Sequence, residues 1–222
     1  MCADLLIWDE DLRFQAVLSE VQEHTILDVP RCYILWQLGK TVSAITGDAA
    51  ELGVYRGGTA KLLAKACPGR TLHLFDPFTG LPAPSLIDVM GEGEFIDTSL
   101  EQVEDYLRDC RDVRIYPGLF PETARPTKDA QFCFVHVDAD LYRSVLDACI
   151  WSYPRLRPGG VMVFDDHGWS CSPGAKQAVD EFFADRPEYP VYLPTGQAVV
   201  IRHHAATDST GSPRGWWRRR RR

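Results

Sequence analysis

The amino-acid sequence predicts an α/β fold: a doubly wound, mostly parallel sheet of seven strands with an antiparallel strand at the C-terminal end. Five strand-like segments alternate with helix-like segments, and several strands are continuously apolar, as in a parallel sheet covered by helices on both faces. The last two strand-like segments, 191–193 and 198–201, are joined by a short turn around Pro194-Thr-Gly196. Such a short connection forms a hairpin, so we expect one reversed strand at the edge of the sheet.

Local composition places the individual elements. Helices are expected where good helix formers or a capping Ser or Thr open a segment: about 10–24, 30–46, 59–66, 99–110, 142–155 and 174–185. Further strands are expected at β-rich runs: 49–53, 71–75, 113–116, 132–138 and 160–165. Residues 157–160 are expected to form the turn before the last of these strands. The irregular stretch 77–97 is too long for a simple connection, which favours a lid or binding loop.

Length and composition bound the class of protein. With 222 residues, 45% of them hydrophobic and 25% charged, the chain resembles an ordinary globular domain. We expect one domain over 1–204 with a helical segment at about 1–46. No apolar stretch is long enough for a membrane span, and the N-terminus lacks the features of a signal peptide. Seven scattered cysteines without a C-x-x-C pair argue for reduced thiols, so a cytoplasmic location is expected.

Charge is divided unevenly along the chain. Residues 205–222 contain six arginines and one aspartate, a net +5, so the other 204 residues carry −12 for the chain to total −7. So acidic a domain is not expected to bind nucleic acid. The small, polar and then basic tail is expected to be disordered. Contact of this tail with anionic lipid, RNA or the acidic face of the domain stays an open alternative.

Aspartates stand where two buried strands are expected to end. Asp138 and Asp140 follow the apolar run 132–137, and Asp165 and Asp166 follow 161–164. Ligands bind beyond the carboxyl ends of strands in such a sheet, and carboxylates crowded there repel each other unless a cation lies between them. Oxygen ligands suit magnesium, calcium or manganese. Any one such aspartate could instead cap a helix, and Asp140 could cap the helix that opens at Leu141.

A glycine-rich turn lies at the end of the first predicted strand, in Glu51-Leu-Gly53-Val-Tyr-Arg-Gly57-Gly58-Thr59. Glycine lets the backbone approach a ligand closely, and the following helix offers free N–H groups. The spacing differs from the dinucleotide fingerprint G-x-G-x-x-G. Asp76, at the end of the next strand, could accept hydrogen bonds from both hydroxyls of a ribose. The two features together predict a cofactor that contains adenosine.

Four motifs resemble the macrocin O-methyltransferase family: ELGVYRGGT, FDPFTGLP, HVDADLYRS and YPRLRPGGVMVFDDH. The resemblance runs from roughly Ile45 to Phe183. These are class I S-adenosylmethionine enzymes, with a Rossmann-like fold, that methylate sugar hydroxyls with the help of magnesium. The resemblance therefore implies S-adenosyl-L-methionine as the cofactor, and Mg²⁺ or Mn²⁺ held by Asp138, Asp165 and Asp166.

The resemblance also implies roles for other residues. The expected cofactor pocket is made of strand ends and turns: Glu51, Gly53, Tyr55, Gly57, Thr59, Asp76, Ser99 and Gly118. Asp140 is placed as the general base. His136, two residues before Asp138, and His167, just beyond Asp166, are alternatives for the base or for orienting a ligand. Trp169 is the preferred aromatic wall for a sugar.

We expect a homodimeric O-methyltransferase whose acceptor is a hydroxyl of a saccharide or glycosylated small molecule, with vicinal hydroxyls chelating the cation. A methyltransferase for the 1-position of a short methylmannoside in polysaccharide biosynthesis would suit so compact a chain. The alternative is a catechol-type phenol O-methyltransferase, in which a lysine commonly follows the first aspartate by three, where this chain has Leu141. A nucleotide-sugar or NAD-binding enzyme fits the glycine spacing poorly. A non-enzymatic binding module would depend on the arginine tail.

Overall fold

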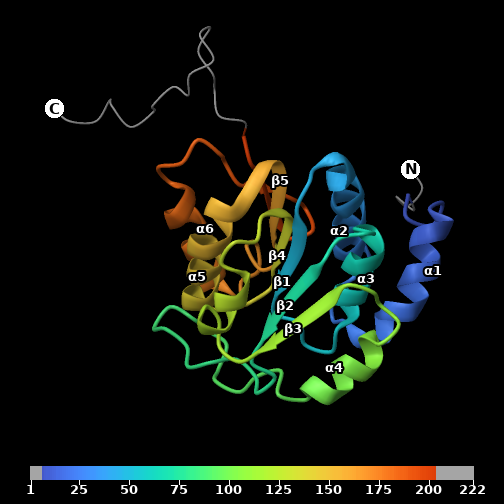
Figure 1. Cartoon of the computed structure of the whole chain (residues 1–222). Coiled ribbons are helices and arrows are strands. Elements are labelled where there is room, and N and C mark those ends of the chain that lie inside the picture. Colours follow the sequence, from blue (N-terminus) through green and yellow to red (C-terminus); the bar gives the residue numbers. More distant parts are fainter. Residues whose placement is uncertain (1–6, 204–222) are drawn as a thin grey trace, which may run out of the picture.

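A twisted seven-stranded sheet forms the centre of the protein in the computed structural model, which describes residues 7–203 (Figure 1). The strands are β1 (Asp48–Leu52), β2 (Leu72–Asp76), β3 (Val113–Pro117), β4 (Phe132–Val137), β5 (Leu156–Phe164), β6 (Val191–Tyr192) and β7 (Ala198–Ile201). Their order is β3-β2-β1-β4-β5-β7-β6, with β1 to β5 parallel and β7 antiparallel to β5. The predicted fold class is confirmed. The reversed strand β7 lies one position inside the edge, because β6 pairs with its outer side.

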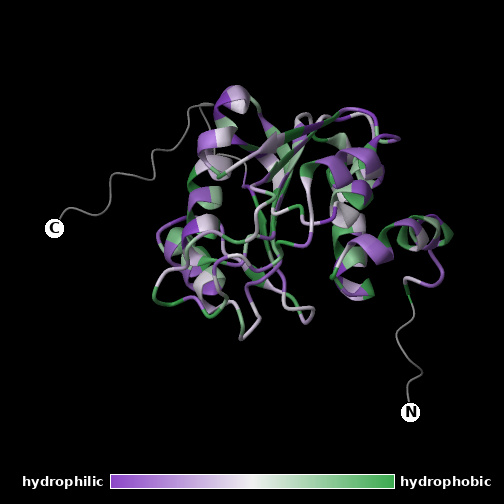
Figure 2. Cartoon of the chain, turned by 90° about the horizontal axis from the view of Figure 1, so that it is seen from below, coloured by the Kyte–Doolittle hydropathy of each residue, from purple (hydrophilic) through white to green (hydrophobic). Residues whose placement is uncertain are grey.

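Helices cover both faces of this sheet. One face carries α1 (Leu12–Val21), α2 (Val29–Thr41), α3 (Gly58–Ala66) and α4 (Leu100–Leu107), and the other carries α5 (Tyr142–Ser152) and α6 (Pro173–Phe183) (Figure 1). The central strands are mainly apolar, whereas the helices carry polar residues outward (Figure 2). The sheet therefore separates two cores, one containing Phe14, Leu35 and Leu62 and the other Val145 and Phe182.

Short 3₁₀ turns extend several of the helices. They are η1 (Gln22–His24) after α1, η2 (Val42–Ala44) after α2 and η4 (Tyr153–Arg155) after α5, whereas η3 (Glu122–Thr127) lies by itself between β3 and β4. The helices expected at 10–24 and 30–46 are thus each an α-helix followed by a tighter turn. Both begin at an aspartate that accepts a backbone N–H three residues on: Asp11 from Phe14, at 3.1 Å, and Asp28 from Arg31, at 2.9 Å.

The segment 157–160, expected to be a turn, lies inside β5. The pairing of β4 with β5 passes from Phe132–Leu156 directly to Phe134–Val161, so the segment forms a bulge of the strand. Its backbone is held by the chain after β7: Gly159 N–H donates to the Arg202 carbonyl at 2.7 Å, and Arg202 N–H donates to the Gly160 carbonyl at 2.8 Å. Backbone pairing across the sheet therefore overrides the local preference of Pro and Gly for a turn.

The loop 77–97 contains no helix or strand. Two backbone hydrogen bonds close its base: Leu81 N–H donates to the Glu94 carbonyl at 2.8 Å, and Gly93 N–H donates to the Leu81 carbonyl at 2.9 Å. The loop is therefore a closed excursion between β2 and α4, and we call it the lid loop.

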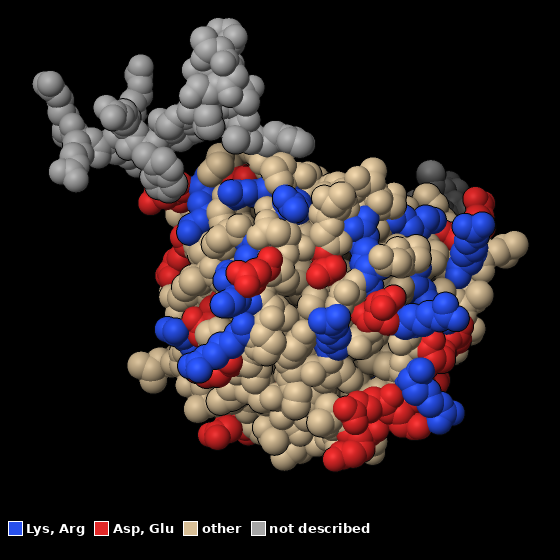
Figure 3. Space-filling model, viewed as in Figure 1, with Lys and Arg blue, Asp and Glu red and all other residues tan. Residues whose placement is uncertain are grey.

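None of the helices within 7–203 has the length and apolar character needed to cross a bilayer. On the face shown in Figure 3, Lys and Arg alternate with Asp and Glu and form no continuous basic area. The predicted tail, 205–222, lies outside the described residues.

Candidate active site

Three carboxylates converge where β4 and β5 end. These strands are neighbours, with Val137 paired to Phe164, so the residues that follow them leave the sheet side by side. One carboxylate oxygen from each of Asp138, Asp165 and Asp166 lies within 4.8 Å of the other two. We call these three residues the acidic cluster. Its donor set consists only of oxygen atoms, which suits Mg²⁺, Mn²⁺ or Ca²⁺ and not a soft metal.

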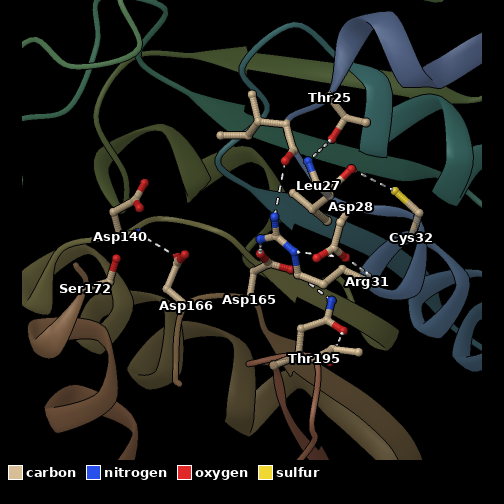
Figure 4. A network of polar contacts seen from close by, with 12 residues as sticks. Thr25, Leu27, Asp28, Arg31, Cys32, Asp140, Asp165, Asp166, Ser172 and Thr195 are labelled. Carbon is tan, nitrogen blue, oxygen red and sulfur yellow. Dashed lines mark hydrogen bonds and ion pairs between the residues drawn. The ribbon is translucent and has the colours of Figure 1, made fainter. Parts of the chain in front are cut away.

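Asp165 is the most strongly held member of the acidic cluster (Figure 4). Its side chain is fully buried, and its two oxygens accept hydrogen bonds from Arg31 Nη1 at 2.5 Å and from Gln197 Nε2 at 2.9 Å. Burial by itself raises the pKa of Asp165, but His136, Arg31 and Gln197 together outweigh that effect and lower it. This carboxyl group is therefore ionised in the folded protein.

The other two carboxyl groups of the acidic cluster have no cationic partner at hydrogen-bonding distance within 7–203. Burial, followed by repulsion from neighbouring aspartates, raises the pKa values of Asp138 and Asp166 well above the ordinary range. A divalent cation between the carboxylates would remove that repulsion. The residues present therefore fit an oxygen-coordinated divalent cation.

Asp140 lies beside the acidic cluster, and it lines a cavity that Asp138 and Asp166 also line. Its backbone is left-handed, with φ of +54°, and its N–H donates to Asp166 Oδ2 at 3.2 Å (Figure 4). Burial, with the charges of Asp165 and Glu94 next, raises its pKa to about 7, against an opposing hydrogen bond from Ser172. Helix α5 has Leu141 at its N-cap, so Asp140 does not cap that helix. A carboxylate with a pKa near 7 suits a general base.

The cavity has a volume of about 310 Å³ and opens at the carboxyl ends of the parallel strands. The glycine-rich turn, the end of β2, the lid loop and the segment before α2 all contribute to its wall. Gly53 has φ of +87°, and a Cβ placed there would lie 1.7 Å from the Asp138 carbonyl oxygen. The glycine therefore allows the glycine-rich turn and Asp138 to line one cavity.

Asp76 organises the glycine-rich turn. Its Oδ2 accepts the N–H groups of Val54 at 2.7 Å and Tyr55 at 3.1 Å, and its Oδ1 accepts that of Phe78 at 2.6 Å. Burial raises the pKa of Asp76, while these three backbone hydrogen bonds oppose the rise. Asp76 lines the cavity, and Oδ1 has lone-pair capacity left for a ligand hydroxyl.

Comparison with known proteins identifies the family of the chain. A family model described as macrocin O-methyltransferase matches residues 10–189, most of the chain. This chain belongs to the macrocin O-methyltransferase family. It is therefore an S-adenosylmethionine-dependent O-methyltransferase, as the motifs predicted.

The chain is similar to O-methyltransferases that are named for different acceptor compounds. Mycinamicin III 3''-O-methyltransferase of Micromonospora griseorubida is 29% identical over 181 residues, covering 72% of this chain and 70% of the relative. Demethyldecarbamoylnovobiocin O-methyltransferase of Streptomyces niveus is 29% identical over 194 residues, covering 79% of this chain and 73% of the relative. The solved O-methyltransferase NovP has a TM-score of 0.71 and 27% identity, covering 82% of this chain and 83% of its own.

Most of the predicted cofactor residues line the cavity of this family member: Gly53, Tyr55, Thr59, Asp76 and Gly118. Three others do not. Glu51 is fully buried beneath the turn, and its Oε1 lies 3.0 Å from His136 Nδ1. A Cβ at Gly57 would face α4 residues such as Val103, and Ser99 caps α4 by accepting the Gln102 N–H at 3.3 Å. These three residues support the pocket from outside it.

Neither of the two histidines predicted as alternative bases, His136 and His167, lines the cavity. His136 is fully buried, and its Nε2 lies 3.7 Å from Asp165 Oδ1. Burial lowers the pKa of His136, but the hydrogen bonds of Asp165 and Glu51 outweigh this and raise it to about 10. His167 points to α6, where its Nε2 lies 2.9 Å from Asp180 Oδ1. Asp140 is therefore the only one of the three predicted base candidates that lines the cavity.

Arg31 and Gln197 were missed by sequence analysis. Arg31 lines the cavity, and its guanidinium carbon lies 5.2 Å from the centre of the Trp169 ring, which also lines it. Arg31 and Gln197 are 134 and 32 residues away from Asp165 in sequence. No local pattern in the sequence points to either contact.

Proposed function

We propose that this enzyme methylates a hydroxyl of a saccharide or glycosylated small molecule, with S-adenosyl-L-methionine as methyl donor and a divalent cation held by the acidic cluster. The observation that carries the proposal is the acidic cluster at the edge of the cavity. Asp138 and Asp166 line the cavity together with Asp140 and the glycine-rich turn, and Asp165 is fully buried beside them. The relatives named for methylation of mycinamicin III and of a rhamnosyl tetracenomycin support a glycosylated acceptor.

Asp140 alone is too weak a base for an alcohol. A sugar hydroxyl as weakly acidic as water, with a pKa of about 15.7, differs from a pKa of about 7 by about 9 units, or about 12 kcal/mol. A bound divalent cation supplies Lewis acidity, which lowers the pKa of a coordinated hydroxyl. Vicinal hydroxyls of a sugar offer two oxygen donors for such a site. The metal and the base together therefore account for a reaction that Asp140 cannot support alone.

The residues of the chain have distinct tasks in this mechanism. Asp140 would accept the proton from the acceptor hydroxyl, and bound S-adenosyl-L-methionine would supply the methyl group to the hydroxyl oxygen and leave as S-adenosylhomocysteine. Arg31 and Gln197 hold Asp165 in place, and His136 lies behind it. The glycine-rich turn and Asp76 position the donor. Holding donor and acceptor in register supplies on the order of 7–11 kcal/mol of the barrier reduction.

A screen of methyl acceptors with isotopically labelled S-adenosyl-L-methionine tests the function. Glycosylated small molecules and short methylmannosides, the acceptors that would start a polymethylated polysaccharide, form one arm, and catechols form the other. We expect labelled sugar product with Mg²⁺ and none in EDTA. Turnover of catechols alone would favour the phenol O-methyltransferase alternative, and unchanged sugar turnover in EDTA would remove the cation from the mechanism.

Two further expectations accompany this proposal. A cytoplasmic location and a homodimer remain predictions from the sequence. Light scattering of the purified full chain tests the second, because a homodimer of a 25.0 kDa chain has twice that mass.

A further inference from the structure

Helix α5 begins beside Asp140, but its own N-cap residue does not cap it. The N-cap is Leu141, which has no polar side chain, and helix N-termini need acceptors for their free N–H groups. The acceptor comes instead from the lid loop: Asp88 Oδ1 accepts the Tyr142 N–H at 2.8 Å across 54 residues of sequence. The second oxygen, Oδ2, accepts the Ser85 N–H at 2.7 Å, and Asp88 N–H donates to the Ser85 carbonyl at 3.0 Å. Asp88 thus closes a turn of the lid loop and binds that turn to α5.

Helix α6 also makes room for the Asp88 carboxylate, because it has a glycine, Gly174, where the two meet. A Cβ built at Gly174, in the first turn of α6, would lie 1.9 Å from Asp88 Oδ1 and 2.8 Å from the Tyr142 nitrogen. Any larger residue at 174 would displace the Asp88 side chain. The carboxylate therefore lies between the first turns of two 11-residue helices, where both helix dipoles favour a negative charge.

The position of this contact connects the lid loop to the site. Residues of the lid loop, including Leu81, Met90 and Phe95, form one wall of the cavity. Tyr142 follows Asp140 by two residues, and Asp140 sits in a left-handed turn held by Asp166. Docking of the lid loop therefore fixes the first turn of α5 at the place where the chain leaves Asp140.

We propose that Asp88 is a positioning residue that docks the lid loop onto the first turn of α5 and so closes the cavity around the bound cofactor. It does not touch the reacting atoms. It acts through the Tyr142 N–H and through the lid-loop residues that line the cavity. The consequence for cofactor affinity rests on the proposed function, whereas the docking contact itself does not.

Amide hydrogen exchange of the full chain tests the docking contact without any activity. In Asp88→Ala we expect the Tyr142 amide and the lid-loop amides to exchange about tenfold faster, as for a docking equilibrium weakened by about 1.4 kcal/mol. Asp88→Asn keeps one acceptor oxygen and should be intermediate. Glu92→Ala is the matched control, since Glu92 is an exposed acid of the same loop with no hydrogen bond or ion pair to another described residue; its exchange should equal that of the wild type.

A double variant, Asp88→Ala with Gly174→Ala, distinguishes loss of the docking contact from a general loss of structure. Gly174→Ala should speed exchange by itself, yet add nothing in the Asp88→Ala background, because both changes break the same contact. Equal Tyr142 exchange in wild type and Asp88→Ala, or additive effects in the double variant, would overturn the proposal.

Calorimetry with S-adenosylhomocysteine tests the consequence for the site. We expect Asp88→Ala to bind it up to about tenfold more weakly, the factor by which docking is weakened, and to melt about 3–6 °C lower. Glu92→Ala should match the wild type in both measurements. Unchanged affinity in Asp88→Ala would refute the coupling of docking to the cofactor. Failure of the wild type to bind S-adenosylhomocysteine would instead refute the proposed function and leave the exchange result to decide the docking contact.

Discussion

Removing one charge from the acidic cluster should have opposite effects on stability with and without a cation. The sharpest change is Asp166→Asn, because Asp166 is buried, keeps its size as Asn and has no cationic partner at hydrogen-bonding distance within 7–203. Two unit charges within 4.8 Å of each other repel by about 3.5 kcal/mol at an effective dielectric constant of 20. Because the wild-type carboxyl can take up a proton instead, we expect the variant in EDTA at pH 8 to gain a smaller amount, about 1–3 kcal/mol.

The wild type should respond to Mg²⁺ in the other direction. At a concentration about 100 times the dissociation constant, a cation that binds only the folded state adds about 2.7 kcal/mol to the free energy of unfolding. For a domain of this size that raises the melting temperature by about 5–10 °C. Asp166→Asn should show little of this rise.

Thermal unfolding in EDTA and in excess Mg²⁺ measures both effects, and Glu92→Ala serves as the control that changes an exposed acid. We expect the order of the two melting temperatures to reverse: the variant melts higher in EDTA and the wild type melts higher in Mg²⁺. If Asp166→Asn lost stability in EDTA, or gained as much from Mg²⁺ as the wild type, the cluster would not be a repulsive set relieved by a cation.

Four further predictions concern the same site. Asp140→Asn should lower turnover by about 10²- to 10⁴-fold and leave calorimetric affinity for S-adenosylhomocysteine unchanged; near-normal turnover would exclude it as the base. His167→Asn should keep turnover within about threefold in the same assay, because that side chain binds Asp180 outside the cavity. Arg31→Met breaks a buried ion pair with Asp165 and should lower the free energy of unfolding in EDTA by about 3 kcal/mol, measured with urea; a loss under about 0.5 kcal/mol would contradict the contact. In EDTA the free energy of unfolding, measured by denaturant titration at each pH, should fall as pH rises from about 4 to 7. The reason is that the folded-state pKa of Asp140, raised to about 7, lies above its unfolded value, so the folded state binds more protons in that window. A free energy of unfolding that rises over this range would contradict the prediction.

Much of the fold follows from local features of the sequence. Apolar runs of strand length, alternating with helix-forming segments, predict the parallel sheet, and the short 194–197 connection predicts the hairpin. The position of Asp138, Asp165 and Asp166 at the ends of buried runs predicts that they meet, because parallel strands present their carboxyl ends at one edge. The segment 157–160 shows where local preference fails, since pairing with Arg202 draws it into a strand.

The sequence by itself thus determined the layered fold, the shared edge of the acidic cluster and the presence of a glycine-rich turn after the first strand. Only the tertiary structure decided which groups hold each carboxylate and which reach the cavity. Arg31 and Gln197 on Asp165, and Asp88 on the Tyr142 N–H, are contacts between segments 32 to 134 residues apart. The alternation of residues along a strand predicts on which face a side chain lies, but not which distant segment packs over that face. His136 therefore lies under the acidic cluster and not in the cavity, because burial and its contacts with Glu51 and Asp165 set its direction.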